Sequence, residues 1–487
     1  MIPMTLSEIA AVVGGSVHDD QGSVVTAPAF IDSRVAEEGG LFVAVEGERV
    51  DGHAYVDEAL AAGAAAVLAR RPVGAPAVVV DDVLTALADL ARHVLTRLPE
   101  VTVVALTGSQ GKTSTKDLLA QVLGKRGATV ATLGSFNNEL GLPLTVLRAD
   151  TSTRYLVLEM GARGIGHLRD LCAIAPPQVS VVLNVGKAHL GEFGSQEAIA
   201  QAKGELVEAL PADGVAVLNA DDRLVSAMAA RTVARVFTFG ESEAADVRAL
   251  GVRLDDSGRA ELDLEVDGER EHVRLQLVGE HHVGNAAAAA AAALSLGMSL
   301  DEVAAALSGA GNTSRWRMEV HERADGVTVV NDAYNANPDS MRAALKALAA
   351  LGRGRGARTI AVLGEMRELG DAATEEHDAV GRLAVRLDIN QLVVVGEPAR
   401  ALHLGACLEG SWGGESVFVP DHEAALAWLR EHLAPGDVVL VKASRAAALE
   451  RVAEALLEPV PETGTETDPG TGAEADRETG PNEENRP

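Results

Sequence analysis

The chain has 487 residues, nearly half of them hydrophobic, and a formal net charge of −29. This length favours two to four domains, and the acidic balance argues against the basic surface that nucleic acids or anionic membranes require. The two cysteines lie far apart and outside any Cys/His pattern, which argues against disulfides and zinc. Residues 1–10 do not resemble a signal peptide, and no apolar run reaches the ~20 residues of a membrane span. We therefore expect a cytoplasmic protein.

The predicted elements divide the chain into α/β units. Residues 1–98 mix short strands, such as 41–45, with a helix near 56–62, which is typical of a small mixed α/β domain. Residues 99–313 begin with a strand at 101–107, a glycine-rich turn and a helix at 112–123. Strand and helix then alternate, which predicts a mostly parallel sheet. The further elements of this alternation are expected at 155–158, 167–174, 179–185, 196–210 and 215–218. Short alternating strands at 247–278 indicate an antiparallel excursion before a helix at 283–296.

Residues 314–458 repeat strand and helix and predict a Rossmann-like third domain. The glycine cluster at 352–356 is expected between a helix and the next strand, which is the wrong context for a dinucleotide fingerprint, so no dinucleotide cofactor is assigned. The tail, 459–487, is acidic and has no aromatic residue. It is expected to be disordered.

The sharpest local motif follows the strand at 101–107. It consists of Thr107, Gly108, Ser109, Gln110, Gly111, Lys112, Thr113 and Ser114. A glycine-rich loop that opens a helix presents backbone amides to phosphate oxygens, while Lys112 can reach the terminal phosphates and the Thr113 hydroxyl can bind Mg²⁺. Leu106 stands where the usual motif has its first glycine, so the sequence predicts a variant P-loop. The alternative is an ordinary glycine-rich turn, which the strand and helix context disfavours.

Two further polar residues follow strands of the same predicted sheet. Glu159 ends the strand at 155–158, and His189 follows the strand at 179–185. Ligands gather at the carboxyl edge of a parallel sheet, so both could serve an Mg²⁺ site, although a solvated glutamate or a structural histidine is the common alternative. The base-reading motif of GTPases is absent, which favours ATP.

Lys203 falls on the apolar stripe of the predicted helix 196–210. An unpaired buried ammonium is costly, so burial lowers the pKa of the amine, and a neutral amine can react with CO₂ to give a carbamate that binds Mg²⁺. A lysine that extends along the helix to reach solvent is the alternative, which periodicity alone favours.

Together these motifs resemble the Mur ligases over nearly the whole chain up to about residue 458. The P-loop, Glu159, His189 and Lys203 in the segment Ala-Lys-Gly-Glu match the family pattern in order. So do three later positions, Asn285 in His-His-Val-Gly-Asn, Arg317 in Arg-Trp-Arg-Met-Glu and Asp332 in Asn-Asp-Ala-Tyr-Asn-Ala-Asn-Pro. The resemblance implies that Lys203 is carbamylated and that Asn285, Arg317 and Asp332 contact the nucleotide.

Less universal segments resemble the D-alanyl-D-alanine-adding branch of the family. They are NNELGLPLT from Asn137 and Asn138 onward, EMG at 159–161 and NDAYNANPDSM at 331–341. The Asp-Asn-Pro-Arg segment of the diaminopimelate-adding branch is absent, as is the pattern of folylpolyglutamate synthases. Ser33, Arg34 and Gly47 lie in segments that resemble the uridine-nucleotide-binding parts of the first domain.

The resemblance implies a ligase with a UDP-muramoyl tripeptide, D-alanyl-D-alanine and ATP as substrates. We expect a monomer that binds no nucleic acid and no membrane. The tripeptide carboxylate would attack the γ-phosphate, and the dipeptide amine would displace the acyl phosphate. Two Mg²⁺ ions would be held by Thr113, Glu159, His189 and carbamylated Lys203. Lys442, Ser444 and Arg445 are predicted to receive the dipeptide. The alternatives are a ligase that adds diaminopimelate or lysine, and a P-loop ATPase that acts as a switch or assembly factor.

Overall fold

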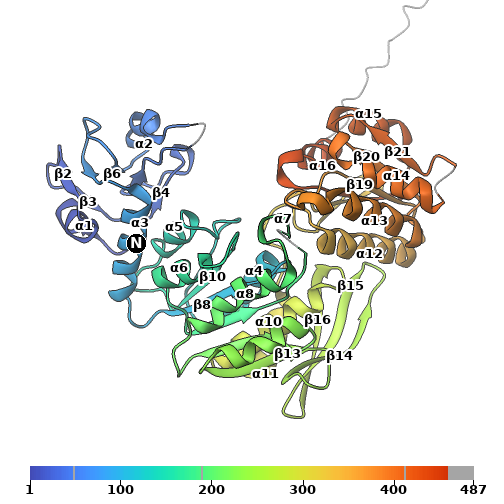
Figure 1. Ribbon diagram of the computed structural model, residues 1–487, viewed down its shortest axis with the longest axis horizontal. Helices are drawn as coiled ribbons and strands as arrows, with labels where there is room; N and C mark the ends of the chain where they lie inside the picture. The colour runs from blue at the N-terminus through green and yellow to red at the C-terminus, as the bar shows by residue number, and fades with distance from the viewer. Residues whose placement is uncertain (48–49, 188–189, 411–412, 459–487) are drawn as a thin grey trace, which may run out of the picture.

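The computed structural model describes residues 1–47, 50–187, 190–410 and 413–458, the side chain of Leu190 excepted. Three α/β units follow one another along the chain, and the first and third lie on opposite sides of the second (Figure 1). This arrangement confirms the predicted mixed α/β class. The predicted acidic tail lies outside the described residues. In the described part of the chain, no helix combines the length and the apolar character needed to cross a membrane.

The N-terminal unit contains a two-stranded and a five-stranded sheet. Strands β4 to β7 pair in parallel in sequence order, and β2 joins β7 in the antiparallel direction. The strands are β1 (Met4–Thr5), β2 (Ser16–His18), β3 (Val24–Val25), β4 (Ala29–Phe30), β5 (Leu41–Val43), β6 (Ala66–Ala69) and β7 (Ala77–Val79). The helices are α1 (Leu6–Val13), α2 (Val56–Ala61) and α3 (Val83–Thr96).

The middle unit is a nine-stranded sheet in the order β16-β15-β14-β13-β12-β11-β8-β10-β9. Its strands are β8 (Thr102–Thr107), β9 (Thr129–Ala131), β10 (Tyr155–Glu159), β11 (Val179–Val182), β12 (Val215–Asn219), β13 (Arg235–Gly240), β14 (Val247–Leu254), β15 (Arg259–Val266) and β16 (Glu269–Val278). Strands β8 to β13 are parallel to all their neighbours, and β14 is parallel to β13. The pairs β14–β15 and β15–β16 are antiparallel. The predicted antiparallel excursion at 247–278 is therefore confirmed.

Helices cover both faces of this sheet. They are α4 (Lys112–Gly124), α5 (Gly141–Val146), α6 (His167–Ile174), α7 (Leu190–Phe193), α8 (Gln196–Glu208), α9 (Arg223–Ser226), α10 (His282–Ser295) and α11 (Leu300–Gly309). Helix α10 is alanine-rich because it is buried on all sides, in one core with α4, α11 and the strands. Small side chains allow α10 and α4 to pack closely, and this packing supports the P-loop from behind.

The C-terminal unit is a six-stranded sheet in the order β17-β18-β22-β19-β20-β21, parallel except for β17. Its strands are β17 (Glu319–Glu322), β18 (Thr328–Asn331), β19 (Thr359–Leu363), β20 (Gln391–Val395), β21 (Ser416–Val419) and β22 (Val438–Lys442). Its helices are α12 (Pro338–Arg355), α13 (Ala373–Arg386), α14 (Arg400–Glu409), α15 (His422–His432) and α16 (Glu450–Leu457).

The glycine cluster at 352–356 needs a correction, because α12 runs through it to Arg355. A Cβ on Gly352 would lie 2.2 Å from Thr359 Cγ2, and a Cβ on Gly354 would lie 2.7 Å from the Asp256 carbonyl oxygen. These glycines serve the close packing of the end of α12 against β19 and against the turn between β14 and β15. Gly356 then ends the helix with a φ of 62°.

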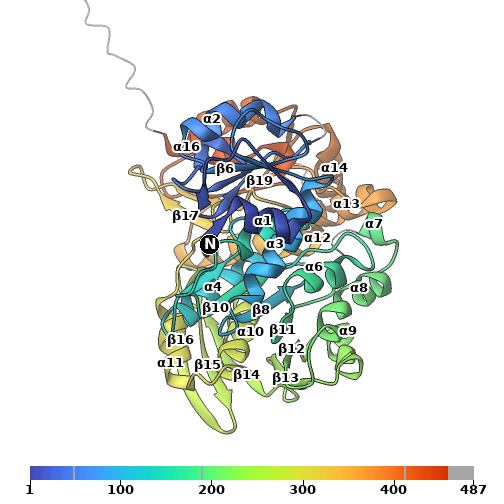
Figure 2. The same cartoon turned by 90° about the vertical axis from the view of Figure 1, so that its left-hand side faces the viewer.

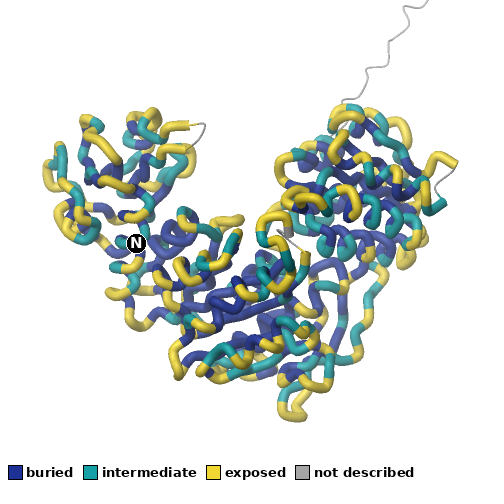
Figure 3. The backbone as a smooth tube through the Cα atoms, viewed as in Figure 1, coloured by how far each residue is buried: buried dark blue, intermediate teal, exposed yellow. Residues whose placement is uncertain are grey.

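The N-terminal and middle units share one continuous hydrophobic core. Helix α3 packs on α5 and α6 of the middle unit, and Figure 2 shows α3 and α6 close together beneath the N-terminal sheet. The C-terminal unit has two core clusters, one on each face of its sheet, and Val278 of β16 joins one of them from the middle unit. The buried backbone accordingly continues from the N-terminal unit into the middle unit in Figure 3. A shared core restrains relative motion, so the first two units move together more readily than either moves with the third.

Candidate active site

The loop between β8 and α4 has the geometry of a phosphate-binding loop. Gly111 has a φ of 79°, in the left-handed region, and a Cβ there would lie 2.4 Å from Asn285 Oδ1. A Cβ on Gly108 would lie 2.9 Å from the Leu183 Cβ. Lys112 begins α4 and donates to the Gly108 carbonyl oxygen at 2.8 Å, across the loop. Burial lowers the pKa of the Lys112 ammonium, an effect that the Glu159 carboxylate opposes. The loop therefore directs a poorly solvated cation towards an anion site at a helix N-terminus.

We expect Gly111→Ala to raise the KM for ATP roughly tenfold and to lower the stability by about 1 kcal/mol, since alanine tolerates a positive φ poorly and the new methyl group displaces Asn285. Gly124→Ala, at the other end of α4, is the matched control because a Cβ there meets nothing within 4 Å. Steady-state kinetics and thermal unfolding of both variants test this. An unchanged KM in Gly111→Ala would show that the close approach to Asn285 is not needed.

Glu159 is the last residue of β10 and is almost fully buried. Its Oε2 accepts a hydrogen bond from the Thr113 hydroxyl at 2.9 Å, and its Oε1 accepts one from Asn137 Nδ2 at 2.8 Å. Its backbone N–H donates to Thr132 Oγ1. The three predicted residues Thr113, Asn137 and Glu159 thus form one cluster, and a carboxylate beside a P-loop hydroxyl is a suitable Mg²⁺ site. The side chain of the neighbouring Asn138 accepts a hydrogen bond from the Gly141 N–H, at the first residue of α5.

Lys203 lies on α8, whose N-terminus is capped by Ser195. The residue is only 5% exposed, and it lines the same cavity as Lys112 and Glu159. Within the described residues, its ammonium has no hydrogen bond or ion pair. Burial, and to a smaller extent the nearby Lys112 charge, lowers the pKa of Lys203 well below its usual range. The side chain lines the cavity and does not extend to the outer surface, which disfavours the alternative of a lysine that extends along the helix to reach solvent.

His189 lies outside the described residues. The segment before it packs against the P-loop: Asn184 Oδ1 accepts hydrogen bonds from the backbone N–H groups of Ser109 and Gln110, and the Gly186 N–H donates to Ser109 Oγ at 2.9 Å. The predicted strand 179–185 therefore ends early, at Val182, because the following residues hydrogen-bond to the loop rather than to β12. Asn184 was missed by the sequence reasoning, although it lies at a strand end.

The C-terminal unit contributes Arg317 to the P-loop. Arg317 Nη2 lies 3.3 Å from Thr113 Oγ1, and the guanidinium lies over the Tyr334 ring, 4.3 Å from its centroid. Arg317 Nε is buried without a hydrogen-bond partner among the described residues. Tyr334 also hydrogen-bonds to Ser135 of the middle unit. A cation with an unused donor beside Thr113 suits the nucleotide phosphates.

Asp332 and Lys442, which were predicted as separate ligands of ATP and of the dipeptide, form a buried ion pair. Lys442 Nζ lies 2.6 Å from Asp332 Oδ2 and donates to the Asn335 carbonyl oxygen, and Asp332 Oδ1 accepts from the Met318 N–H. Burial lowers the pKa of the Lys442 ammonium, while Asp332 opposes this. Neither side chain lines the cavity. In this structure the pair joins the end of β18 to β22. Through the bond to the Asn335 carbonyl oxygen it also anchors the loop between β18 and α12, which contains Tyr334.

A cavity of about 880 Å³ lies between the middle and C-terminal units. The predicted residues that line it are Ser109, Gln110, Gly111, Lys112, Thr113, Ser114, Asn137, Asn138, Glu159, Lys203, Arg317, Ser444 and Arg445. Thr107, Gly108 and Asn285 lie behind this lining. Ser444 Oγ accepts from the Arg367 N–H at 2.9 Å, and Arg445 pairs with Glu450 while lying over the Trp316 ring. Residues not anticipated from the sequence include Arg163, His167, Tyr334, Asn337 and Arg367. Of these, Arg367 lies shortly after the end of strand β19, and this position could have identified it as a candidate from the sequence.

Ser33, Arg34 and Gly47 lie in the N-terminal unit and do not line this cavity. Ser33 donates to Glu58, Arg34 pairs with Asp32 at 2.6 Å, and the Gly47 N–H donates to the Val50 carbonyl oxygen.

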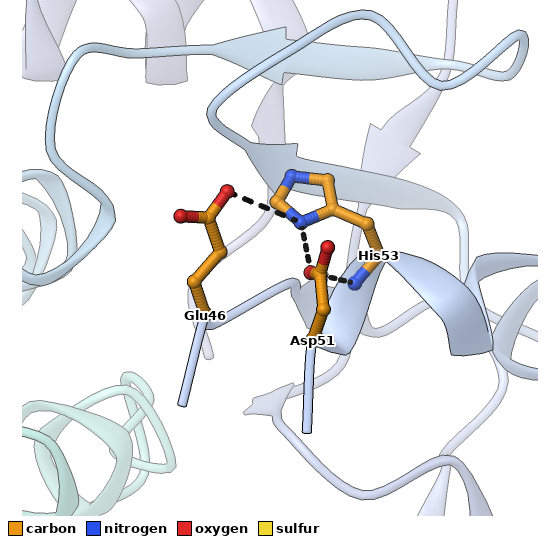
Figure 4. A group of neighbouring side chains, drawn as sticks. All are labelled: Glu46, Asp51 and His53. Carbon is orange, nitrogen blue, oxygen red and sulfur yellow. Dashed lines mark hydrogen bonds and ion pairs between the residues drawn. The ribbon is translucent and has the colours of Figure 1, made fainter. Parts of the chain in front are cut away.

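Beside Gly47, the side chains of Glu46, Asp51 and His53 converge (Figure 4). Glu46 pairs with Arg70 and Arg71, and Asp51 pairs with Arg71 and His53. Because guanidinium groups already neutralise both carboxylates, this cluster is suited to joining Glu46 and Asp51 to the arginines rather than to binding a metal.

The chain matches three models of protein families. Residues 30–95 match the Mur ligase family catalytic domain, residues 106–293 the Mur ligase middle domain, and residues 316–445 the Mur ligase glutamate ligase domain. A curated relative from Mycobacterium tuberculosis, named UDP-N-acetylmuramoyl-tripeptide--D-alanyl-D-alanine ligase, is 52% identical over 499 aligned residues, which cover 94% of this chain and 98% of the relative.

Solved structures agree with these matches. A crystal structure of MurF from Acinetobacter baumannii has a TM-score of 0.82 at 32% identity and covers 94% of this chain and 99% of its own. MurF ligase from Thermotoga maritima, in complex with ADP, has a TM-score of 0.75 at 33% identity and covers 88% and 97% of the two chains. The chain therefore belongs to the Mur ligase family.

Proposed function

We infer that this chain is an ATP-dependent amide ligase that joins D-alanyl-D-alanine to a UDP-N-acetylmuramoyl tripeptide, forming the pentapeptide precursor of peptidoglycan. The observation that carries this inference is the interdomain cavity, in which the P-loop, Glu159 and Lys203 face Arg317 and Arg445. The Mycobacterium tuberculosis relative carries the name of this activity and aligns over nearly its whole length. The ADP bound to the Thermotoga maritima ligase supports ATP as the energy source.

The reaction brings several anions together. The tripeptide carboxylate oxygen forms a bond to the γ-phosphorus of ATP as the bond to the bridging oxygen breaks and ADP leaves. The dipeptide amine then attacks the acyl carbon, phosphate leaves, and the ammonium proton is lost to solvent. Lys112 and Arg317 converge on the phosphate side of the cavity and offset the charge that accumulates there. Enclosure between domains protects the acyl phosphate from water.

The residues present fit Mg²⁺. The Glu159 carboxylate and Thr113 hydroxyl suit a hard cation, and Lys203 is a buried amine without an acidic partner among the described residues. We propose that Thr113 and Glu159 hold one ion, and that Glu159, His189 and carbamylated Lys203 hold a second. Mg²⁺ would supply charge neutralisation and orientation of the phosphoryl oxygens.

The other substrates are assigned by position. Arg367, Ser444 and Arg445 lie on the C-terminal side of the cavity, where cationic and hydroxyl groups suit the dipeptide carboxylate. Asn285 and Asp332 remain proposals for nucleotide contacts, and Ser33, Arg34 and Gly47 for the uridine nucleotide. We propose that the enzyme works as a cytoplasmic monomer, without nucleic acid or membrane.

Phosphate release in the presence of ATP and Mg²⁺ tests the assignment. We expect release only when UDP-muramoyl tripeptide and D-alanyl-D-alanine are added together, because the carboxylate and the amine belong to different substrates. Comparable turnover with diaminopimelate on the UDP-muramoyl dipeptide would contradict the branch. Release that does not depend on any muramoyl nucleotide would instead favour a P-loop ATPase that acts as a switch.

A further inference from the structure

Four charged side chains join the middle and C-terminal units outside the cavity lining. Lys187, in the loop after β11, places its Nζ 2.5 Å from Oε1 of Glu376 on α13. Arg342 of α12 lies 2.9 Å from the other oxygen of Glu376 and 3.1 Å from Asp339 Oδ1. The second oxygen of Asp339 accepts from the Lys187 backbone N–H at 2.9 Å. Charges therefore alternate in sign around a closed ring of four residues.

The ring depends on Lys187, since the other three members belong to the C-terminal unit. Glu376 is nearly buried, with a side chain only 8% exposed, whereas Lys187 is about half exposed. A carboxylate held this far from water needs a partner. A Cβ on Gly186 would lie 2.2 Å from Asp339 Oδ2, so glycine is required for the close approach of the two units. These features distinguish the ring from an ordinary exposed ion pair, which contributes little to the stability of a protein.

The ring is connected to the P-loop by hydrogen bonds. Gly186, the neighbour of Lys187, donates to Ser109 Oγ. Asn337, the N-cap of α12, donates from Nδ2 to the Ser109 carbonyl oxygen at 3.3 Å and accepts from the Ser340 N–H. Asp339 lies in the first turn of the same helix. The start of α12 is therefore hydrogen-bonded both to the P-loop and to the loop that follows β11.

We propose that Lys187, Asp339, Arg342 and Glu376 form an interdomain latch that holds the C-terminal unit at its working distance from the P-loop. Lys187 is a positioning residue, because it touches no part of the cavity lining and acts through α12 and the groups that follow β18. This proposal rests on the proposed ligase function, since the effect of the latch is measured as a change in the rate of ligation. Loss of the latch should weaken capture of the dipeptide, which is assigned to the C-terminal side of the cavity, more than nucleotide binding, to which the middle unit contributes the P-loop and the C-terminal unit contributes Arg317.

The test compares Lys187→Met, Lys187→Arg and the control Arg386→Met in the full chain. Arg386 pairs with Glu409 inside the C-terminal unit, so its loss breaks an exposed pair but no interdomain contact. We expect Lys187→Met to lower kcat/KM for D-alanyl-D-alanine about tenfold, the order expected for a close charge pair across an interface. The KM for ATP should change less than this, because the P-loop itself belongs to the middle unit, and the melting temperature should change little. Lys187→Arg should keep most of the activity, and Arg386→Met should match the parent.

A second arm does not depend on activity. Small-angle X-ray scattering of the protein without substrates should give a larger radius of gyration for Lys187→Met than for the parent and for Arg386→Met. In a double-mutant cycle, Glu376→Gln should add little to Lys187→Met, because either change opens the same ring. Equal radii of gyration together with parental kcat/KM in Lys187→Met would overturn the latch. A parent inactive with every substrate pair would instead overturn the proposed function and leave the scattering result as the measure of the latch.

Discussion

Replacing Lys203 by arginine is expected to reduce ligation by roughly 10²–10³-fold, the scale of losing one charged group that stabilises a transition state. The amine lies buried in the cavity wall, and burial lowers its pKa well below the usual range, which favours the neutral form that can add CO₂ with loss of a proton. Arginine stays charged and cannot form the carbamate. Lys203→Ala should fail equally, with the fold intact, because alanine suits the helix and removes a buried polar group. Phosphate release measures both variants.

Three further measurements separate a carbamate from a simple buried cation. A short carboxylic acid such as acetate should restore part of the activity of Lys203→Ala, and depletion of bicarbonate should inhibit the parent. ¹³C-labelled bicarbonate should give a carbamate carbon resonance in the parent that Lys203→Ala lacks. Lys346→Arg, at an exposed position on α12, is the control and should be active. Near-parental turnover in Lys203→Arg would rule out the carbamate and reduce the proposed second metal site to His189 and Glu159.

Glu159→Gln is expected to lower kcat by about 10³-fold, because an amide has no charge with which to hold Mg²⁺ beside the P-loop. Glutamine is nearly the same size, and its side-chain oxygen can still accept one hydrogen bond from Thr113 or Asn137. Its amide nitrogen would then face the other of these two donor groups, which now bonds to a carboxylate oxygen. The fold should persist while the Mg²⁺ dependence weakens, which a titration of turnover against Mg²⁺ concentration measures.

Glu197→Gln serves as the control for charge alone, since Glu197 is exposed in the first turn of α8. Its turnover and Mg²⁺ dependence should match those of the parent. If Glu159→Gln kept the parental response to Mg²⁺, the carboxylate would have only the structural role of joining Thr113 to Asn137.

The sequence by itself was sufficient for features that depend on neighbours along the chain. Hydrophobic periodicity predicted helix 167–174 with the bounds it has in the structure. The P-loop was recognisable because a tight turn between a strand and a helix has a local chemical signature in glycine, lysine and threonine. The position of Glu159 followed from a general rule, that parallel strands present their carboxyl ends at one edge of a sheet.

Only the tertiary structure decided which side chains meet. Periodicity placed Lys203 on an apolar stripe but could not show whether the ammonium reaches solvent, because this depends on what packs over α8. Asp332 and Lys442 each resembled a ligand, yet they neutralise each other across two strands that are distant in sequence. Lys187 had no recognisable role until α12 and α13 were placed beside it. Burial and charge pairing are properties of a three-dimensional neighbourhood, and residues far apart along the chain supply that neighbourhood.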